Sequence, residues 1–180
     1  MNSQNVLRYG KWLAGLLLIV WFVGRYQGTW FGDPVLDHFL AKHDGDVVAA
    51  LIEAERPRLD AQGAIIGIHL ARSINRHRLP NLRYSNKALE YIKQIRTIRS
   101  LTIVPPTHID DRGMAHIGEM TQLESLGING LPITDAGLAQ LHSLKNLQLL
   151  RAYVTNCTQD GINDFQAAVP ACEIQWGPRN

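Results

Sequence analysis

Cysteine is nearly absent from this chain of 180 residues, which contains only Cys157 and Cys172. Two cysteines are too few for a disulfide framework, and their spacing does not form a C-x-x-C metal or redox motif. Buried free thiols are therefore the expected state of both residues. An oxidising compartment would permit a disulfide between them if the geometry allowed it, and this alternative stays open.

A large net charge of one sign is also lacking. The chain has 18 Lys and Arg residues against 16 Asp and Glu residues, so its net charge is only +2. No aromatic platform or recognition helix accompanies the one cluster of basic residues, which consists of Arg72, Arg76, Arg78 and Arg83. We expect a solvated loop at this cluster and no nucleic-acid partner.

The motifs of common catalytic and cofactor sites are missing as well. There is no H-E-x-x-H, nucleophile elbow, P-loop or G-x-G-x-x-G. Only the segment DHFLAKHDGD suggests catalysis or a metal, through Asp37, His38, His43, Asp44 and Asp46. Its two histidines are five residues apart, about 140° around a helix, so they do not converge as i, i+4 ligands would. The sequence favours a solvated linker here, and it predicts no catalysis, cofactor, metal or small-molecule substrate.

A metal-dependent hydrolase that uses this segment is the less favoured alternative. Isolated histidines elsewhere are predicted to be exposed. They need no catalytic or metal-binding role, since they could contact a partner or have no specific function. These are His69, His108, His116 and His142.

An uncharged apolar run, WLAGLLLIVWFV, stands near the N-terminus between Lys11 and Arg25. The 13 residues between these charges span about 20 Å as a helix, which is less than the roughly 30 Å of a hydrocarbon core. Snorkelling of both charges and the aromatic residues at both ends make a span over residues 9–30 feasible. No A-x-A-like cleavage site follows the run. We predict an uncleaved single-pass membrane anchor; a cleaved signal peptide and a buried helix are the alternatives.

Self-similarity at a fixed spacing marks the rest of the chain. Residues 109–128 overlay residues 133–152 with a shift of 24 and seven matched positions. An earlier copy, residues 85–103, overlays with a shift of 25. The outer units are degenerate, as expected of units that cap a stack, and they are residues 65–70 and 158–176.

The spacing of the apolar residues differs between the first and the second half of each unit. Leu138, Leu141 and Leu144 recur every three residues, as on one face of a helix, whereas Leu150 and Ala152 alternate as in a strand. We therefore expect each unit to be a helix, with Leu138, Leu141 and Leu144 on one face in this copy, followed by a short strand. Burial of half a dozen aliphatic side chains in one unit stabilises it by roughly 10 kcal/mol. The conformational entropy lost when about 24 residues become ordered costs more than this, so a single unit is not stable and the units must stack.

Two further features of the unit concern the start of its helix. Thr134 and Asp135 stand where the helix begins, where they can satisfy free N–H groups and complement the helix dipole. Gly137 has no side chain, which is consistent with close packing between neighbouring units.

The segment TDAGLAQLHSLKNLQLLRA, residues 134–152, resembles the leucine-rich repeat family, in its ribonuclease-inhibitor-like class and its bacterial T-D-A-G-L units. AVPACEIQW, residues 168–176, is similar to the ALPNCKI ending of such arrays, and residues 47–70 are similar to their leading helix and hairpin. The resemblance covers about 47–176. Ala152 in place of the final Leu and the inserted residues 72–84 depart from the pattern.

This resemblance implies an α/β fold: a short right-handed solenoid with parallel strands on one face and helices on the other, used for protein binding. Some bacterial members carry an N-terminal membrane segment. The expected organisation is a membrane anchor at 1–31, a linker at 32–46 and a repeat domain at 47–180. Arg8 and Lys11 outweigh Arg25, which places the N-terminus in the cytoplasm and the repeat domain outside.

Strand alternation predicts which side chains leave the core. If Leu126 and Ile128 point inward, Ser125, Gly127 and Asn129 lie on the open face. The equivalent outward sets are Gly67, His69, Ala71; Ser100, Thr102, Val104; and Leu149, Arg151, Tyr153. The predicted partner-binding residues are His69, Thr102, Asn129, Leu149, Arg151 and Tyr153.

The last set combines an aromatic residue with an arginine, which is typical of interface hot spots. Coverage of Leu149 and Tyr153 by a terminal cap is the alternative. The sequence thus predicts a non-enzymatic, membrane-anchored module that binds an unidentified protein, and a structural spacer in an envelope is the second hypothesis.

Overall fold

The structure is a computed structural model, which describes residues 57–70 and 84–178. Within these residues the protein is α/β, with a six-stranded, mostly parallel sheet and four helices. The strands lie in the sheet in sequence order: β1 (Arg58–Leu59), β2 (Ile65–Leu70), β3 (Ser100–Ile103), β4 (Ser125–Gly127), β5 (Leu149–Thr155) and β6 (Glu173–Pro178). The helices are α4 (Asn86–Ile92), α5 (Asp111–Gly118), α6 (Asp135–Ala139) and α7 (Gln159–Ala168).

A hairpin forms the first edge of the sheet. β1 is antiparallel to β2, whereas every later pair of neighbouring strands is parallel. Asp60 holds the turn, because its Oδ1 accepts the N–H groups of Gln62 at 2.9 Å and Ala64 at 2.8 Å. Gly63 adopts φ +82°, which favours glycine. The hairpin expected within 47–70 is therefore present in the part of that range that the structure describes.

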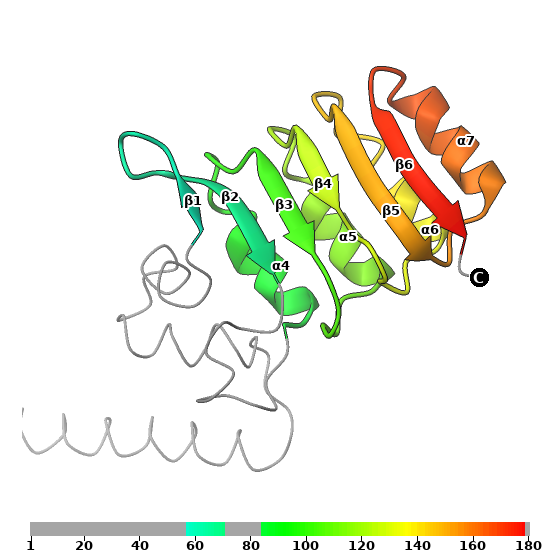
Figure 1. Cartoon of the computed structure of the whole chain (residues 1–180), viewed down its shortest axis with the longest axis horizontal. Helices are drawn as coiled ribbons and strands as arrows, with labels where there is room; N and C mark the ends of the chain where they lie inside the picture. The colour runs from blue at the N-terminus through cyan, green and yellow to red at the C-terminus, as the bar shows by residue number, and fades with distance from the viewer. Residues whose placement is uncertain (1–56, 71–83, 179–180) are drawn as a thin grey trace, which may run out of the picture. The chain divides into compact units, whose positions relative to one another are not determined.

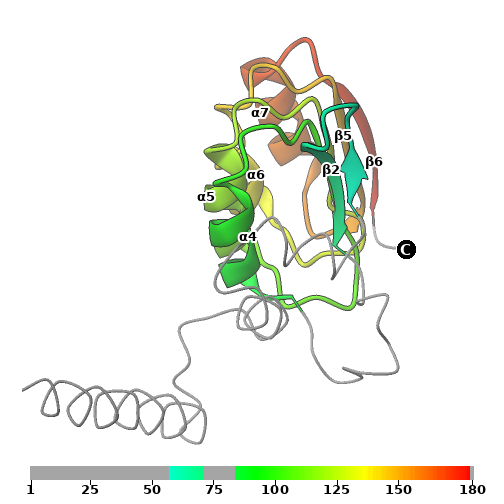
Figure 2. The ribbon, with the colours of Figure 1, turned by 90° about the vertical axis from the view of Figure 1, so that its left-hand side faces the viewer.

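The strand register follows the shift found in the sequence. Leu101 pairs with Leu126, and Leu126 pairs with Leu150, on neighbouring parallel strands. Ile174 of the degenerate last unit pairs in turn with Leu150. The predicted alignment of these apolar positions is confirmed. All four helices lie on one face of the sheet (Figures 1 and 2), so the core is formed between that face and the helices.

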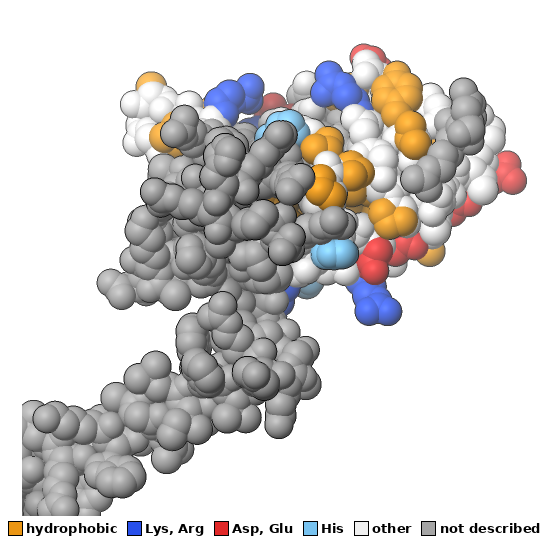
Figure 3. All heavy atoms as spheres, turned by 60° about the horizontal axis from the view of Figure 1, so that its bottom comes forward, with side chains coloured by type: hydrophobic (Ala, Val, Ile, Leu, Met, Phe, Trp, Pro, Cys, Tyr) orange, Lys and Arg blue, Asp and Glu red, His pale blue; other side chains and the backbone are white. Residues whose placement is uncertain are grey.

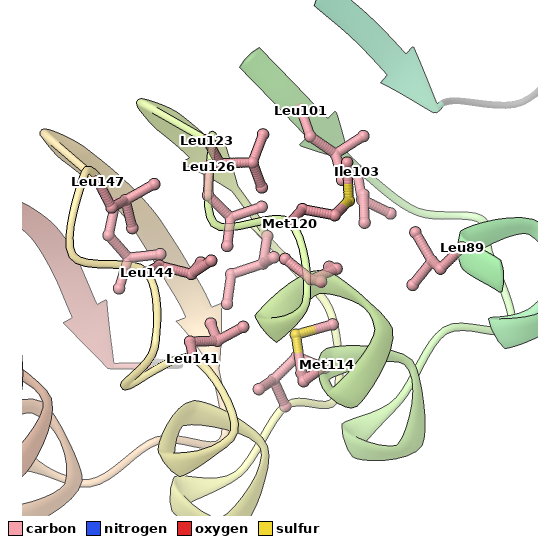
Figure 4. Close-up of a cluster of buried hydrophobic side chains, with 14 of the residues drawn as sticks. Leu89, Leu101, Ile103, Met114, Met120, Leu123, Leu126, Leu141, Leu144 and Leu147 are labelled. Carbon is pink, nitrogen blue, oxygen red and sulfur yellow. The ribbon is translucent and has the colours of Figure 1, made fainter. Parts of the chain in front are cut away.

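The core residues come from the repeated apolar positions. Figure 4 shows leucines and methionines of successive units packed against one another between helices and strands. The residues that the helices and turns contribute with no exposed surface include Leu89, Met114, Met120, Leu138, Leu141 and Leu144. Ala152 is also fully buried and pairs with the larger Trp176 of β6. A small residue therefore occupies the position that Ile103 and Ile128 hold in the two preceding units.

The helix expected to carry Leu138, Leu141 and Leu144 is shorter in the structure. α6 ends at Ala139, and the three-residue spacing continues as a series of turns. Leu141 donates its N–H to the carbonyl of Leu138, Leu144 to that of Leu141, and Leu147 to that of Leu144, each at 3.0 Å. A spacing of three matches these i, i+3 turns better than the 3.6-residue α-helix. The apolar periodicity alone did not distinguish a longer α-helix from a short helix followed by turns.

Each of the helices α4 to α7 begins at a capping side chain. The N-cap residues are Ser85, Asp110, Thr134 and Thr158, and each side chain accepts an N–H of the first turn. The predicted cap at Thr134 is thus confirmed. The first residue of one helix also binds the cap of the next. At the first link Asn86 donates its Nδ2 to Asp110 Oδ1 at 2.7 Å and accepts the N–H of Asp110 at 3.1 Å. An amide suits this link because the next cap is a carboxylate.

Both cysteines are buried free thiols. The alternative of a disulfide between them is not found. Burial raises the pKa of the Cys172 thiol to about 11, and it also raises the pKa of Cys157. Neither thiol is therefore a reactive thiolate at neutral pH.

Several predicted segments lie outside the described residues. They are the anchor at 1–31, the linker at 32–46, the metal-like segment with Asp37, His38, His43 and Asp44, the helix expected before 57, and the basic cluster at 72–83. Within the described ranges, no helix is both long enough and apolar enough to cross a membrane. The same ranges contain no group of three or more His, Cys, Asp or Glu side chains arranged to hold a metal ion.

Candidate functional site: the open face of the sheet

One face of the sheet has no helix over it in the described part of the chain (Figures 1 and 2). We call this surface the open face. Its outward positions form rows across the strands, because parallel pairing places residues of successive units side by side. The first row is Gly67, Ser100, Ser125, Leu149 and Glu173, and the second row is His69, Thr102, Gly127, Arg151 and Gln175.

The predicted binding residues are brought together in part. His69 pairs directly with Thr102, and one glycine position separates Thr102 from Arg151. His69 and Arg151 are exposed and Thr102 is half-buried. Three predicted residues from three strands therefore share the second row, although they are 33 and 49 residues apart in the sequence.

Gly67 and Gly127 occupy the outward positions that the strand alternation predicts, but they add little exposed surface to the open face. Gly67 and Gly127 are buried. A Cβ atom at Gly67 would lie 3.5 Å from the Arg58 side chain, and one at Gly127 would lie 3.2 Å from Cγ2 of Thr102. Because glycine has no side chain, the neighbouring side chains lean over its backbone. Ala71, which was assigned to the same face, lies outside the described residues.

A short polar network holds Arg151. Its Nε donates to Oε1 of Gln175 at 3.2 Å, and Nε2 of Gln175 donates to Oε1 of Glu173 at 2.7 Å. The guanidinium makes no other hydrogen bond to a described residue, so its terminal amino groups remain available for an acceptor. Sequence reasoning missed Gln175 and Glu173 because the last unit was degenerate. Extending the outward alternation into that unit would have found both.

Next to this row, β5 contains an irregularity with an unusual backbone. Val154 has φ +59° and lies at a register shift between Tyr153 and Thr155. The equivalent residue one unit earlier is Gly130, which has φ +74°. The fold therefore requires a left-handed residue at this position, and a β-branched residue is strained there. The side chain of Val154 is 42% exposed and that of Tyr153 is 44% exposed.

The other two predicted residues have different surroundings. Asn129 follows β4, and its Oδ1 accepts the backbone N–H of Tyr153 at 3.0 Å. It is half-buried, so its side chain holds the two units together at this edge. Leu149 is also half-buried. The last unit does not cover Tyr153, since β6 lies beside β5 in the sheet and not over it.

Hydrophobic side chains gather at this end of the molecule. Figure 3 is turned so that the C-terminal ends of the strands come forward, and it shows a hydrophobic patch with histidine and basic side chains nearby. The residues with exposed apolar surface after β3 and in β5 include Val104, Pro105, Tyr153 and Val154. Gly130 lies directly against Pro105 at this surface, since a Cβ atom on Gly130 would be 3.0 Å from Cγ of Pro105.

The opposite end of the strands is polar. A hollow of about 300 Å³ is lined by Arg99, Gln122, Glu124, Asn146 and Gln148. Arg99 and Glu124 approach within 3.6 Å and are both about half exposed, so this ion pair contributes little to stability. His108 is exposed as predicted, whereas His116 and His142 are half-buried. The His142 ring lies 6.1 Å from that of Phe165.

The chain matches no protein-family model, and the search of curated proteins finds no match.

Proposed function

We propose that the described region is a short right-handed solenoid of leucine-rich repeats that binds another protein through its open face and has no catalytic activity. The strand order, the shift of 24 or 25 residues in the register, and the repeated helix caps support the repeat assignment. Right-handedness is the general rule for strand–helix–strand connections between parallel strands, which follow it in about 98% of cases.

A single observation carries the binding proposal: Val154 is a strained residue whose side chain is exposed beside Tyr153. Strain of this kind costs about 1–3 kcal/mol and persists chiefly at functional sites. A glycine at this position would adopt the same backbone without strain, as Gly130 does one unit earlier. An exposed apolar side chain on this strained backbone supports a role in contact.

The neighbouring residues indicate the chemistry of the partner. Tyr153 and Val154 offer apolar surface, and Arg151 offers a guanidinium whose orientation Gln175 fixes. Tyrosine and arginine are enriched among the residues that contribute most to binding. We therefore propose a protein partner that presents an apolar side chain next to a carboxylate.

The test is crosslinking in native membranes, followed by mass spectrometry, with the full chain. The variant Arg151→Ala/Tyr153→Ala is expected to capture its partner at least about tenfold less than the wild type, because two central hot-spot side chains are removed. Arg112→Ala is the matched control, since Arg112 is exposed on α5, on the helix side. Circular dichroism and melting temperature should be unchanged in both.

Other outcomes would exclude the proposal. Equal capture by both variants would place the interface elsewhere, and a lower melting temperature of the double variant would make the two residues structural. If the wild type captures no stoichiometric partner, the protein is a spacer.

The apolar run of residues 12–23 supports an anchor that spans residues 9–30. The excess of Arg8 and Lys11 over Arg25 supports a repeat domain outside the cytoplasm. Alkaline carbonate should leave the full-length chain in the membrane fraction. A membrane-impermeant thiol reagent should label Ser125→Cys in intact cells. Release of a shortened chain by carbonate would instead show a cleaved signal peptide.

A further inference from the structure

The charged side chains of the open face are unevenly distributed. The described strands β1 to β5 contain no Asp or Glu. Their basic residues are Arg58, His69 and Arg151, and all three are exposed. A ligand that crosses these strands therefore meets basic side chains but no carboxylate.

Arg58 and His69 lie together beside β2. Arg58 pairs with Gly67, and a Cβ atom at Gly67 would lie 3.5 Å from Nε of Arg58, so the guanidinium lies over β2 on the open face. His69 is two residues further along β2 and faces the same way. Neither side chain makes a hydrogen bond or an ion pair to a described residue. Both can therefore donate to an acceptor of a ligand.

Arg151 lies across the sheet from this pair. Its Nε donates to Oε1 of Gln175 at 3.2 Å, which leaves the terminal amino groups for a ligand. His69 and Arg151 share the second row of the open face, on β2 and β5, which are three strand positions apart (Figure 1). Because neighbouring strands are about 4.8 Å apart, these two positions are separated by about 14 Å.

The outward residues between the two basic groups are small. They are Ser100 and Thr102 of β3 and Ser125 and Gly127 of β4. The hydroxyls of Ser100, Thr102 and Ser125 make no hydrogen bond to a described residue, so they are available to a ligand as donors. No cation stands among them. The site thus has two basic ends and a neutral, hydrogen-bonding middle.

Two acidic residues limit the site without entering it. Glu173 of β6 lies one strand beyond β5, and it would repel an acidic group that extended past Arg151. Glu124 directly precedes β4, but Arg99 approaches it within 3.6 Å and offsets its charge. The surface that favours an anionic ligand therefore extends from β2 to β5.

We propose that the open face binds an extended acidic segment of its protein partner, which crosses β2 to β5 and places one carboxylate on Arg151 and another on Arg58 and His69. In an extended chain, residues four apart lie on the same face and are separated by about 14 Å. The segment therefore carries Asp or Glu at positions i and i+4. This inference rests on the proposed function, and it adds a second anchor to the carboxylate proposed at Arg151.

The spacing of the basic groups favours a peptide over a nucleic acid. One DNA strand carries a phosphate about every 3.4 Å along its axis, so roughly four phosphates would span the distance between the two anchors. Only the two ends of the site offer basic side chains, and the inner phosphates would face uncharged hydroxyls. The apolar surface of Tyr153 and the half-buried Leu149 lies beside Arg151 and also suits a peptide with mixed side chains.

A phage-displayed library of random dodecapeptides is the probe for this site. The target is the full chain, purified in detergent and immobilised. Enriched peptides should carry acidic pairs with the i, i+4 spacing more often than the unselected library does, and more often than acidic pairs at i, i+3 or i, i+5. Enrichment of peptides without this pair, or no enrichment at all, would overturn the proposal.

Variants locate the two anchors with one enriched peptide, whose Kd is measured by fluorescence anisotropy. Arg151→Ala and the double variant Arg58→Ala/His69→Ala should each raise the Kd by about two- to fivefold, as expected when an exposed ion pair is lost. Arg112→Ala, on the helix side, is the control and should leave the Kd unchanged. If only Arg151→Ala weakens binding, the second anchor is wrong and the proposed function stands. If neither variant weakens it, both proposals fail.

A charge exchange tests the second anchor by a gain of binding. Arg58→Glu should weaken the selected peptide, because a carboxylate then faces a carboxylate. Lys in place of one of the two acidic peptide residues should restore most of the binding to Arg58→Glu, whereas Lys at the other residue should not. Restoration also shows that the variant is folded. Failure of both Lys peptides to restore binding would refute the contact with Arg58.

Discussion

The carboxylate of Asp111 binds Thr134 at two points: Oδ1 accepts the Thr134 N–H at 2.9 Å, and Oδ2 accepts the Thr134 hydroxyl at 2.6 Å. Asp111 is the first residue of α5, and Thr134 is the N-cap of α6. The same geometry recurs one unit later between Asp135 and Thr158, at 2.8 and 2.7 Å. These bonds link the N-termini of successive helices and hold neighbouring units in register.

Replacing Asp111 with Ala should lower the free energy of unfolding by about 2–3 kcal/mol, because two hydrogen bonds to a partly buried carboxylate are lost. Chemical denaturation of the full chain measures the effect. Asp160→Ala is the matched control, since Asp160 is in the first turn of α7 but is exposed and makes no hydrogen bond to a described residue. If both variants lose the same free energy of unfolding, Asp111 contributes only through its charge at a helix N-terminus and not through its bonds to Thr134.

Gly137→Ala should destabilise the protein, although alanine favours helices over glycine by about 1 kcal/mol. A Cβ atom at Gly137 would lie 2.2 Å from Oδ1 of Asp111, and the carboxylate cannot retreat without breaking its bonds to Thr134. We expect a net loss of about 2 kcal/mol, within the range for overpacking.

Two further variants make this prediction specific. Gly67→Ala should have little effect, because the nearest atom would be at 3.5 Å. In the background of Asp111→Ala the Gly137→Ala change should cost much less, so the two effects are not additive. Additive losses would show that the carboxylate is not the obstacle.

Val154→Gly should raise the free energy of unfolding by roughly 1 kcal/mol, because a left-handed backbone costs about 1–2 kcal/mol for residues other than glycine. Val154→Asn should act in the same direction. The reciprocal change, Gly130→Val, should destabilise the protein, since Gly130 has φ +74°. Thermal melts of the three variants provide the measurement. If Val154→Gly lowers stability, packing of the valine outweighs its strain.

Stability should fall at alkaline pH through Cys172. Its thiol has a folded pKa of about 11, compared with an ordinary value of 9.0. Between these values the unfolded chain releases the proton and the folded chain keeps it, so the free energy of unfolding decreases by up to about 1.4 kcal/mol per pH unit. Below pH 9 the effect disappears.

The comparison of wild type with Cys172→Ala isolates this effect from other groups that titrate in the same range. Denaturation curves at several pH values from 8 to 11 should show a shallower decline for the variant. Parallel declines would mean that the thiol ionises equally in both states.

Much of the fold was predictable because its units repeat. Leu101, Leu126 and Leu150 occupy matching positions in the sequence, and stacking units by one strand spacing must then bring them together. The cap at Thr134 and the close contact at Gly137 followed from the same alignment. The end of α6 could not be predicted from the alignment, because apolar residues three positions apart fit both an α-helix and a series of turns.

The sequence by itself thus determined which apolar positions are buried and in which order the strands pair, since both follow from local periodicity and a spacing of 24 or 25 residues between units. Only the tertiary structure decided what happens between units. It alone shows the carboxylate of Asp111 filling the space left by Gly137, Gln175 holding Arg151, and Val154 in a glycine conformation. Such contacts depend on side-chain directions and backbone angles at distances of a few ångströms, which no one-dimensional pattern specifies.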